Sequence, residues 1–303
     1  VQVSQNQLAS AHHFANVLFN LMRGGVFVHQ YWIEKADLLN YLETHQRGIV
    51  HRHAAFLDSL PDRFLLADFQ NRVIETPLAL RRLLLTYLPL AFSRRHGDPS
   101  RPWNRFSIDL QTPDGSQRLN YEGNWRDIFQ NWEALAYSYP DYVEAMIGVF
   151  LSATTADGYN PYRISRSGLD WEVPEEGNPW ANIGYWSDHQ IIYLQKLMEL
   201  SQRVHPGAMR AWLRLPLWSY ANVPYRIKPY TELLHDPYNS ILFDRVLHDQ
   251  IEREVRVYGT DARLLRAPDG TPYLASLTEK LLTLLLAKLV NFVPEGGIWM
   301  NTQ

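Results

Sequence analysis

The stretch Tyr121-Glu-Gly-Asn-Trp-Arg-Asp-Ile-Phe-Gln-Asn-Trp-Glu133 is the densest mixture of charged, amide and aromatic side chains in this sequence. Its polar side chains stand among three large rings: Glu122, Arg126, Asp127, Gln130 and Glu133 beside Trp125, Phe129 and Trp132. Sugar hydroxyls need hydrogen-bond donors and acceptors together, and the apolar face of a pyranose stacks on an indole ring. The stretch therefore suits a sugar site, and it suits a buried ion-pair network almost equally well.

The spacing within the stretch gathers its polar side chains on one side of a helix. If the helix begins near Trp125, residues 126, 130 and 133 lie on roughly one side of it. Arg126 could then clamp a carboxylate or donate to two sugar hydroxyls from its planar fork, with Asp127 and Glu122 as acceptors. In the alternative interpretation, Arg126 forms an ion pair that locks a preceding hairpin to the helix. The stretch alone leaves both interpretations open.

The composition is that of a folded protein with a high aromatic content. Of the 303 residues, 46% are apolar and 20% are charged, which excludes a disordered chain. There are 10 Trp, 17 Tyr and 12 Phe, and many of these rings stand beside polar residues. Such a composition is typical of carbohydrate sites and also of large helical cores.

Charge and cysteine content exclude several kinds of site and partner. The net charge is −3 and the basic residues are scattered, so we expect no nucleic-acid partner. The absence of cysteine excludes disulfides, thiolate catalysis and cysteine-based metal sites, and it fits a reducing compartment. The paired histidines at 12–13 and at 51 and 53 lack a matching carboxylate pattern, so we expect no metal and no bound cofactor.

The sequence also lacks the patterns of membrane insertion and export. No stretch approaches the ~20 apolar residues of a transmembrane helix, because Glu279, Lys280 and Lys288 interrupt residues 277–293. The first residues do not combine a charged leader with an apolar block. We therefore expect a cytoplasmic protein without a membrane partner.

Helical periodicity dominates the chain. Apolar residues recur at helical spacing in 7–22, 33–42, 76–88, 127–136, 140–151, 187–200, 206–213, 238–257 and 277–293. Alternation on either side of Pro113-Asp-Gly115 predicts a small β-hairpin near 105–121, and Arg263-Leu-Leu265 with Pro268-Asp-Gly-Thr271 predicts a second small hairpin. The sequence thus predicts an all-α fold, as a single domain over residues 1–303.

Two long loops, residues 153–187 and 215–238, join the predicted helices, and long ordered loops are usually functional. Asn160 and Arg163 follow a turn from which they could reach a ligand, although the segment could equally be a plain turn. Trp186, Asp188 and His189 stand at a helix start, where they could line a cavity rim. In the alternative interpretation Asp188 is only an N-cap.

The run Trp125-Arg126-Asp127-Ile-Phe-Gln130-Asn131 resembles the Arg-Asp-x-x-Gln-Asp signature of cellobiose phosphorylase and related disaccharide and glucan phosphorylases. Further along, Tyr185-Trp-Ser-Asp188-His189-Gln resembles that family's Asp-His-Leu-Trp helix start, in the same order and at a similar spacing. The resemblance covers roughly residues 100–200. It implies the six-hairpin glycosidase superfamily and its (α/α)6 toroid. It also implies that Arg126 and Asp127 hold the non-reducing-end sugar in a cleft that Asp188 and His189 line.

Two departures from the family narrow what the resemblance implies. Asn131 stands where the signature has Asp, and the Trp-Asn-Asp type motif that carries the family's general acid is not found. We therefore expect a piece of a longer protein that holds the sugar without supplying the acid. If a carboxylate of this chain does act as the acid, Glu122 or Glu133 is expected.

The predicted function is the cleavage or phosphorolysis of a glycosidic bond in an oligosaccharide, with inorganic phosphate as co-substrate in the second case. The expected partners are the oligosaccharide and the remainder of the parent chain. The expected substrate-binding residues are Trp125, Arg126, Asp127, Gln130, Asn160, Arg163, Trp186, Asp188 and His189. Two alternatives stay open: a non-catalytic carbohydrate-binding or scaffold domain on the same fold, and a helical protein whose 121–133 cluster is purely structural.

Overall fold

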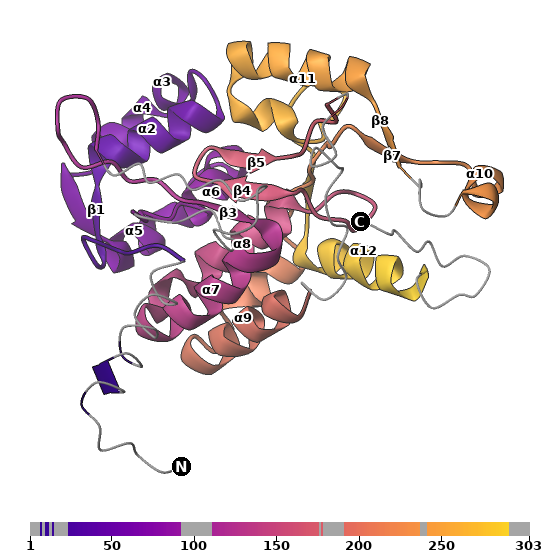
Figure 1. The fold of residues 1–303 in the computed structure, drawn as a ribbon. Coiled ribbons are helices and arrows are strands. Elements are labelled where there is room, and N and C mark those ends of the chain that lie inside the picture. The colour runs from indigo at the N-terminus through magenta and orange to yellow at the C-terminus, as the bar shows by residue number, and fades with distance from the viewer. Residues whose placement is uncertain are drawn as a thin grey trace.

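A computed structural model describes residues 24–91, 111–175, 177, 191–236 and 241–290, together with Gln7, Ser10, Ala11 and Phe14. About half of these residues lie in helices, and short antiparallel strands form small sheets between them (Figure 1). The expectation of an all-α chain is therefore right about the dominant helices and wrong about the strands. The strands are two or three residues long, too short to show the alternation by which a strand is recognised in a sequence.

The N-terminal part consists of short helices around one two-stranded sheet. Strand β1 (Trp32–Glu34) runs into α2 (Lys35–His45) and pairs with β2 (Arg63–Leu65), which runs into α5 (Leu66–Val73). Between them lie α3 (Ile49–Arg52) and α4 (Ala54–Asp58), and α6 (Leu78–Leu85) follows. Helix α2 buries Leu38, Tyr41, Leu42 and His45, which is the spacing of one helical face.

The middle part contains the 121–133 stretch and a helix that is buried along almost its whole length. Strand β3 (Glu122–Asn124) leads into α7 (Trp125–Ser138), and the 3-10 helix η1 (Pro140–Tyr142) turns the chain into α8 (Val143–Ala153). Strands β4 (Arg163–Ser165) and β5 (Gly168–Asp170) complete a sheet of order β3-β4-β5, and α9 (Ile191–Val204) follows. Helix α8 is buried along almost its whole length because its residues are apolar nearly all round.

The C-terminal part alternates short strands with two long helices. Its elements are η2 (Ala208–Leu213), β6 (Trp218–Ser219), β7 (Tyr225–Ile227), α10 (Tyr230–His235), β8 (Ile241–Phe243), α11 (Arg245–Tyr258), η3 (Thr260–Arg263), β9 (Leu274–Ala275) and α12 (Leu277–Val290). Strand β6 pairs with β9, and β7 pairs with β8. Buried side chains from all three parts of the chain form one continuous apolar cluster.

Several predicted boundaries need correction. The helix predicted over 238–257 begins only at Arg245, since Asp244 caps it by accepting from the Leu247 N–H at 3.0 Å and the preceding residues form β8. The segment 206–213 contains a 3-10 helix, and the loops 153–187 and 215–238 contain β4, β5, β6, β7 and α10. Most of the predicted helix 7–22 lies outside the described residues.

The hairpin predicted near 105–121 is described only from residue 111. Its turn is present, with a bridge between Gln111 and Gln117, but residues 118–121 form no strand. The strand nearest to it, β3, begins at Glu122 and pairs with β4. The second predicted hairpin is present as a turn closed by one antiparallel bridge, between Arg266 and Pro272.

Gly259 allows the C-terminal part of the chain to pack closely against α2. It ends α11 with φ +91°, in the region that favours glycine. A Cβ at this position would lie 2.6 Å from the backbone oxygen of His45 and 2.8 Å from that of Thr44. The glycine therefore permits η3 to pack against the end of α2, which places Thr260 and Asp261 beside His45.

Among the described residues, no helix combines the length and the hydropathy that a bilayer crossing requires.

The buried ammonium of Lys280 gives a first stability prediction. Lys280 on α12 is 0% exposed, and its Nζ donates to Thr154 Oγ1 at 2.9 Å and lies 3.4 Å from the Tyr220 ring centroid. Burial lowers the pKa of this amine well below its usual value. The unfolded chain then binds the proton more readily, so wild-type stability falls as the pH drops below the ordinary lysine range.

We expect Lys280→Met to raise the free energy of unfolding at pH 7, because the thioether fills the same space without a charge to desolvate. The gain over wild type should shrink as the pH rises toward 10. Urea unfolding at several pH values measures both effects. A variant less stable than wild type at pH 7 would contradict the assignment.

Candidate functional site

Helix α7 places the side chains of the 121–133 stretch on two opposite faces. Its inner face buries Trp125, Ile128, Phe129 and Trp132, which recur at helical spacing. The Trp132 indole donates from Nε1 to the Gly24 carbonyl at 2.8 Å. The aromatic half of the stretch is thus part of the core.

The expectation that Trp125 stacks against a sugar needs correction. Its side chain is only 2% exposed, with ring centroids 4.8 Å from Phe129 and 4.6 Å from Phe150. Both rings contact the indole, so it offers no open face to a pyranose. The spacing that suggested a sugar platform is equally the spacing of a buried helix face.

Arg163 forms the ion-pair lock that the sequence led us to consider for Arg126. Its guanidinium contacts the Glu122 carboxylate at 3.3 Å and is also paired with Asp170. Arg163 on β4 lies opposite Asp170 on β5, while Glu122 is one step diagonal on β3. Such cross-strand charge pairs stabilise a sheet. These ion pairs therefore join three strands. They engage Glu122 and Arg163, two residues that the sequence placed at the sugar site.

The remaining candidates are distributed over α7 and its neighbours. Glu133 is paired with Lys196 of α9, with its carboxylate 3.1 Å from Nζ. Asp127 is partly exposed and Gln130 is exposed, while Asn160 is buried at 7% exposure. The Arg126 side chain and the residues Trp186, Asp188 and His189 lie outside what the structure describes.

Helices α7 and α9 pack side by side (Figure 1), and two contacts show that they run in the same direction. Glu133 of α7 contacts Lys196. Glu144, which follows the end of α7, accepts from Ser201 Oγ at 2.6 Å. Later residues of α9 thus lie nearer the C-terminal end of α7. The start of α9 at Ile191 is therefore on the same side as the start of α7, where Asp127 is found.

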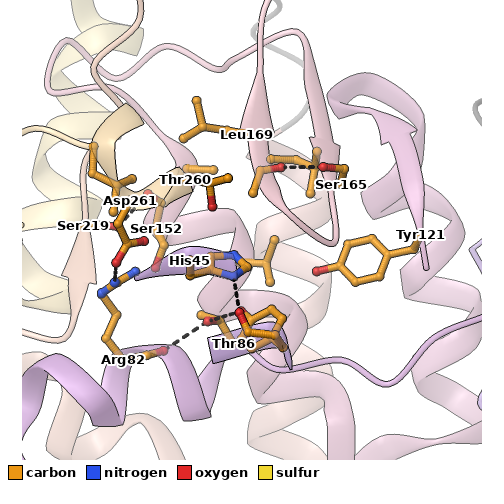
Figure 2. Close-up of a pocket in the computed structure, with 16 residues that line it drawn as sticks. His45, Arg82, Thr86, Tyr121, Ser152, Ser165, Leu169, Ser219, Thr260 and Asp261 are labelled. Carbon is orange, nitrogen blue, oxygen red and sulfur yellow. Dashed lines mark hydrogen bonds and ion pairs between the residues drawn. The ribbon is translucent and has the colours of Figure 1, made fainter. Parts of the chain in front are cut away.

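A separate cavity lies between α2, α6, α8, η3 and the strands β4 and β5 (Figure 2). Its volume is about 60 Å³, and it is partly open to solvent. The polar side chains that line it come from distant parts of the chain: Tyr41, His45, Arg82, Thr86, Tyr121, Ser152, Ser165, Ser219, Thr260 and Asp261. None of these belongs to the predicted site.

His45 is held as a neutral imidazole at the centre of this cavity. Its Nδ1 lies 2.9 Å from the Tyr41 carbonyl oxygen, which can only accept, so Nδ1 carries the proton and Nε2 keeps a free lone pair. The side chain is 7% exposed, and burial lowers its pKa to about 4. The cavity therefore presents a hydrogen-bond acceptor at Nε2.

Three hydroxyl groups surround this imidazole. Ser152 Oγ and Thr260 Oγ1 are buried and have no hydrogen-bond partner among the described residues. The Tyr121 hydroxyl points toward the cavity from the opposite side (Figure 2). Gly168 leaves the space between them open, because a Cβ built there would lie 3.5 Å from Thr260 Oγ1 and 3.9 Å from His45 Nε2.

One wall of the cavity carries a buried ion pair. The Arg82 guanidinium of α6 is paired with the Asp261 carboxylate of η3, and the side chains are only 5% and 8% exposed. Thr86, on the next turn, shares a hydrogen bond of 3.0 Å with the Tyr41 hydroxyl. Because the two charges compensate each other and His45 is neutral, the wall carries no net charge.

The depressed pKa of His45 predicts a loss of stability in mild acid. The unfolded chain takes up this proton near pH 6.5 and the folded chain only near pH 4. Stability is therefore fully present above pH 6.5 and falls between these values, by on the order of 3 kcal/mol. We expect His45→Asn, whose amide can still donate to Tyr41, to remove this component. Urea unfolding of both proteins from pH 7 to pH 4 should show converging stabilities, and parallel curves would contradict the assignment.

Sequence patterns contained a partial signal for the cavity. His45 and Arg82 both fall on the apolar faces of their helices, where a polar residue needs a partner. Ser152, Thr260 and Asp261 carry no such signal, because nothing in their spacing says that η3 folds back on α2. Among the described residues no group of three or more histidine or acidic side chains could hold a metal ion.

The comparisons with known proteins concern mainly the N-terminal part. No curated protein matches the chain. Residues 27–89, roughly a fifth of the sequence, match the model of glycoside hydrolase family 149 insertion domain 1. The matched segment runs from β1 through α6 and supplies Tyr41, His45, Arg82 and Thr86 to the cavity.

Proposed function

We propose that this chain is a carbohydrate-active domain that takes part in cleaving or phosphorolysing a glycosidic bond in an oligosaccharide. The observation that carries the proposal is the match of residues 27–89 to an insertion domain of a glycoside hydrolase family. This match lies outside residues 100–200, on which the resemblance to disaccharide phosphorylases rests. Two separate parts of the chain thus suggest the same kind of chemistry.

The proposed sugar site lies at the start of α7. Asp127 and Gln130 are accessible there, and the parallel packing of α9 brings Ile191 to the same side. Asp188 and His189 directly precede Ile191, so we include them in the site with Arg126 and Trp186. Carboxylate, amide and guanidinium groups together can satisfy vicinal hydroxyls. The helix pair α7 and α8, joined by the short η1, supports our proposal that the chain is one domain of (α/α) toroid type.

We propose that neither Glu122 nor Glu133 supplies the acid that this chemistry requires. A general acid must deliver its proton to the leaving oxygen, and inversion also needs water or phosphate on the opposite face of the sugar. Glu122 is paired with Arg163, and Glu133 with Lys196. We propose that a different group supplies the acid, and that Asp127 and its neighbours hold the substrate.

The proposal is tested by incubating the full-length parent protein with an oligosaccharide panel, with and without inorganic phosphate, and measuring released sugar and sugar phosphate. We expect phosphate-dependent sugar phosphate or phosphate-independent free sugar from at least one member. We also expect Glu122→Gln and Glu133→Gln to retain this activity. No product from any member, together with no binding, would overturn the proposal.

A second candidate is a non-catalytic carbohydrate-binding domain on the same fold. It is favoured by the engagement of both Glu122 and Glu133 in ion pairs and by the match to an insertion domain. Titration of the same panel, followed by tryptophan fluorescence, separates the two candidates. Saturable binding without product in either buffer would favour this one.

A further inference from the structure

We propose that the cavity around His45 is a second ligand site, built for a small neutral polyol of about the size of glycerol. It lies between the segment that matches the insertion domain and the rest of the chain, with α2 and α6 on one side and α8, β4, β5 and η3 on the other. The inference does not depend on the sugar site proposed at α7, since none of that site's residues lines this cavity.

Unpartnered polar atoms indicate that the cavity has a polar occupant. Ser152 Oγ, Thr260 Oγ1 and Arg82 Nε are buried without a hydrogen-bond partner among the described residues. Buried polar groups in folded proteins nearly always have a partner, and a missing one is costly. His45 Nε2 adds a lone pair that faces the same space. An apolar occupant would leave all of these groups unsatisfied.

The kinds of group that line the cavity select a neutral hydroxylated molecule. Hydroxyls of Ser152, Thr260 and Tyr121 both donate and accept, His45 Nε2 accepts, and Arg82 donates. An anion would meet the Asp261 carboxylate and the imidazole lone pair, while a cation would meet the Arg82 guanidinium. Each hydroxyl of a polyol can donate to one of these groups and accept from another.

The size of the cavity sets the size of the ligand. A volume of about 60 Å³ holds roughly four water-sized groups. This suits a short polyol chain and is too small for a complete pyranose ring. The space beside Gly168 is part of this room, because any larger side chain there would project between Thr260 and His45. Glycerol has six heavy atoms, so roughly four of them would fill the cavity and the rest would lie in its opening to solvent.

The test is a titration of glycerol into the full chain, followed by the backbone amide NMR shifts of Ser152, Gly168 and Thr260. We expect saturable shifts at these positions. Ser152→Ala and Thr260→Val should each weaken binding about fivefold to tenfold, the effect of losing one hydrogen bond. Ser59→Ala, at an exposed serine that does not line the cavity, should bind as wild type does. Ser152→Ala and Thr260→Val both nearly preserve the size of the side chain, so we expect them to fold. The test needs only one of the two variants to be folded.

Three results would overturn the proposal. These are the absence of saturable shifts with glycerol, equal binding by the lining variants and wild type, and tighter binding of inorganic phosphate or 1-propanol than of glycerol. A cavity that holds only water would give the first result. Asp127→Ala should leave glycerol binding unchanged, so failure of the sugar site and failure of this site are distinguished.

Discussion

Asp261→Ala is expected to lower the free energy of unfolding by about 3–5 kcal/mol. The Arg82 guanidinium, which is 5% exposed, would remain in the interior without its carboxylate partner. The Arg82 Nε already lacks a hydrogen-bond partner among the described residues, so the variant would leave the group still less satisfied. The ion pair also joins α6 to η3 and thereby closes one wall of the His45 cavity. Urea unfolding at pH 7 measures the loss.

The exposed pair of Arg63 and Glu34 is the matched control. Its atoms are 3.0 Å apart, but the side chains are 50% and 39% exposed. Glu34→Ala should cost only about 0–1 kcal/mol, because water screens the charges. Replacing both buried partners, with Arg82→Met and Asp261→Leu together, should recover much of the stability lost by Asp261→Ala. A loss below about 1 kcal/mol for Asp261→Ala would contradict the buried pair.

Trp125→Ala is expected to destabilise the protein by about 3–5 kcal/mol, whereas Trp125→Phe should cost clearly less. The indole is packed between Phe129 of its own helix and Phe150 of α8, so its removal opens a large cavity in the core. Phenylalanine keeps part of the contact and leaves a smaller gap. Unfolding in urea measures both variants.

Tyr137→Ala is the control on the same helix, because Tyr137 is 60% exposed. It should change the stability by no more than about 0.5 kcal/mol. If the Trp125 indole were a stacking surface for sugars, Trp125→Ala would instead keep its stability and lose only binding. That outcome would contradict the core position of Trp125 and restore the first interpretation of the ring.

The long periodic helices could be predicted from sequence, and the short elements could not. Residues 127–136, 143–151 and 277–290 lie in α7, α8 and α12, because apolar side chains that recur at helical spacing over many residues can be buried together only by a helix. The strands β1 and β2 were missed because three residues are too few to show alternation. Helices α3 and α4, with four and five residues, carry no stripe at all.

The polar positions show a different limit of sequence reasoning. The ion-pair lock considered for Arg126 stays untested, because that side chain lies outside the described residues; the lock that the structure does describe is formed by Arg163 on β4, which pairs with β3. Periodicity cannot say which strands pair. It also cannot say that the glycine ending α11 lets Thr260 and Asp261 approach His45. Contacts between residues so far apart in sequence depend on the packing of the whole chain.

The central claim is that Asp127 holds a sugar, and calorimetric titration of oligosaccharides into the wild-type chain and Asp127→Ala tests it most directly. Asp68→Ala is the control, since Asp68 is an exposed aspartate in the first turn of α5. We predict saturable binding by wild type and Asp68→Ala and at least tenfold weaker binding by Asp127→Ala, as expected for a lost charge-assisted hydrogen bond of about 1.5–3 kcal/mol. Equal affinity of wild type and Asp127→Ala would contradict the account.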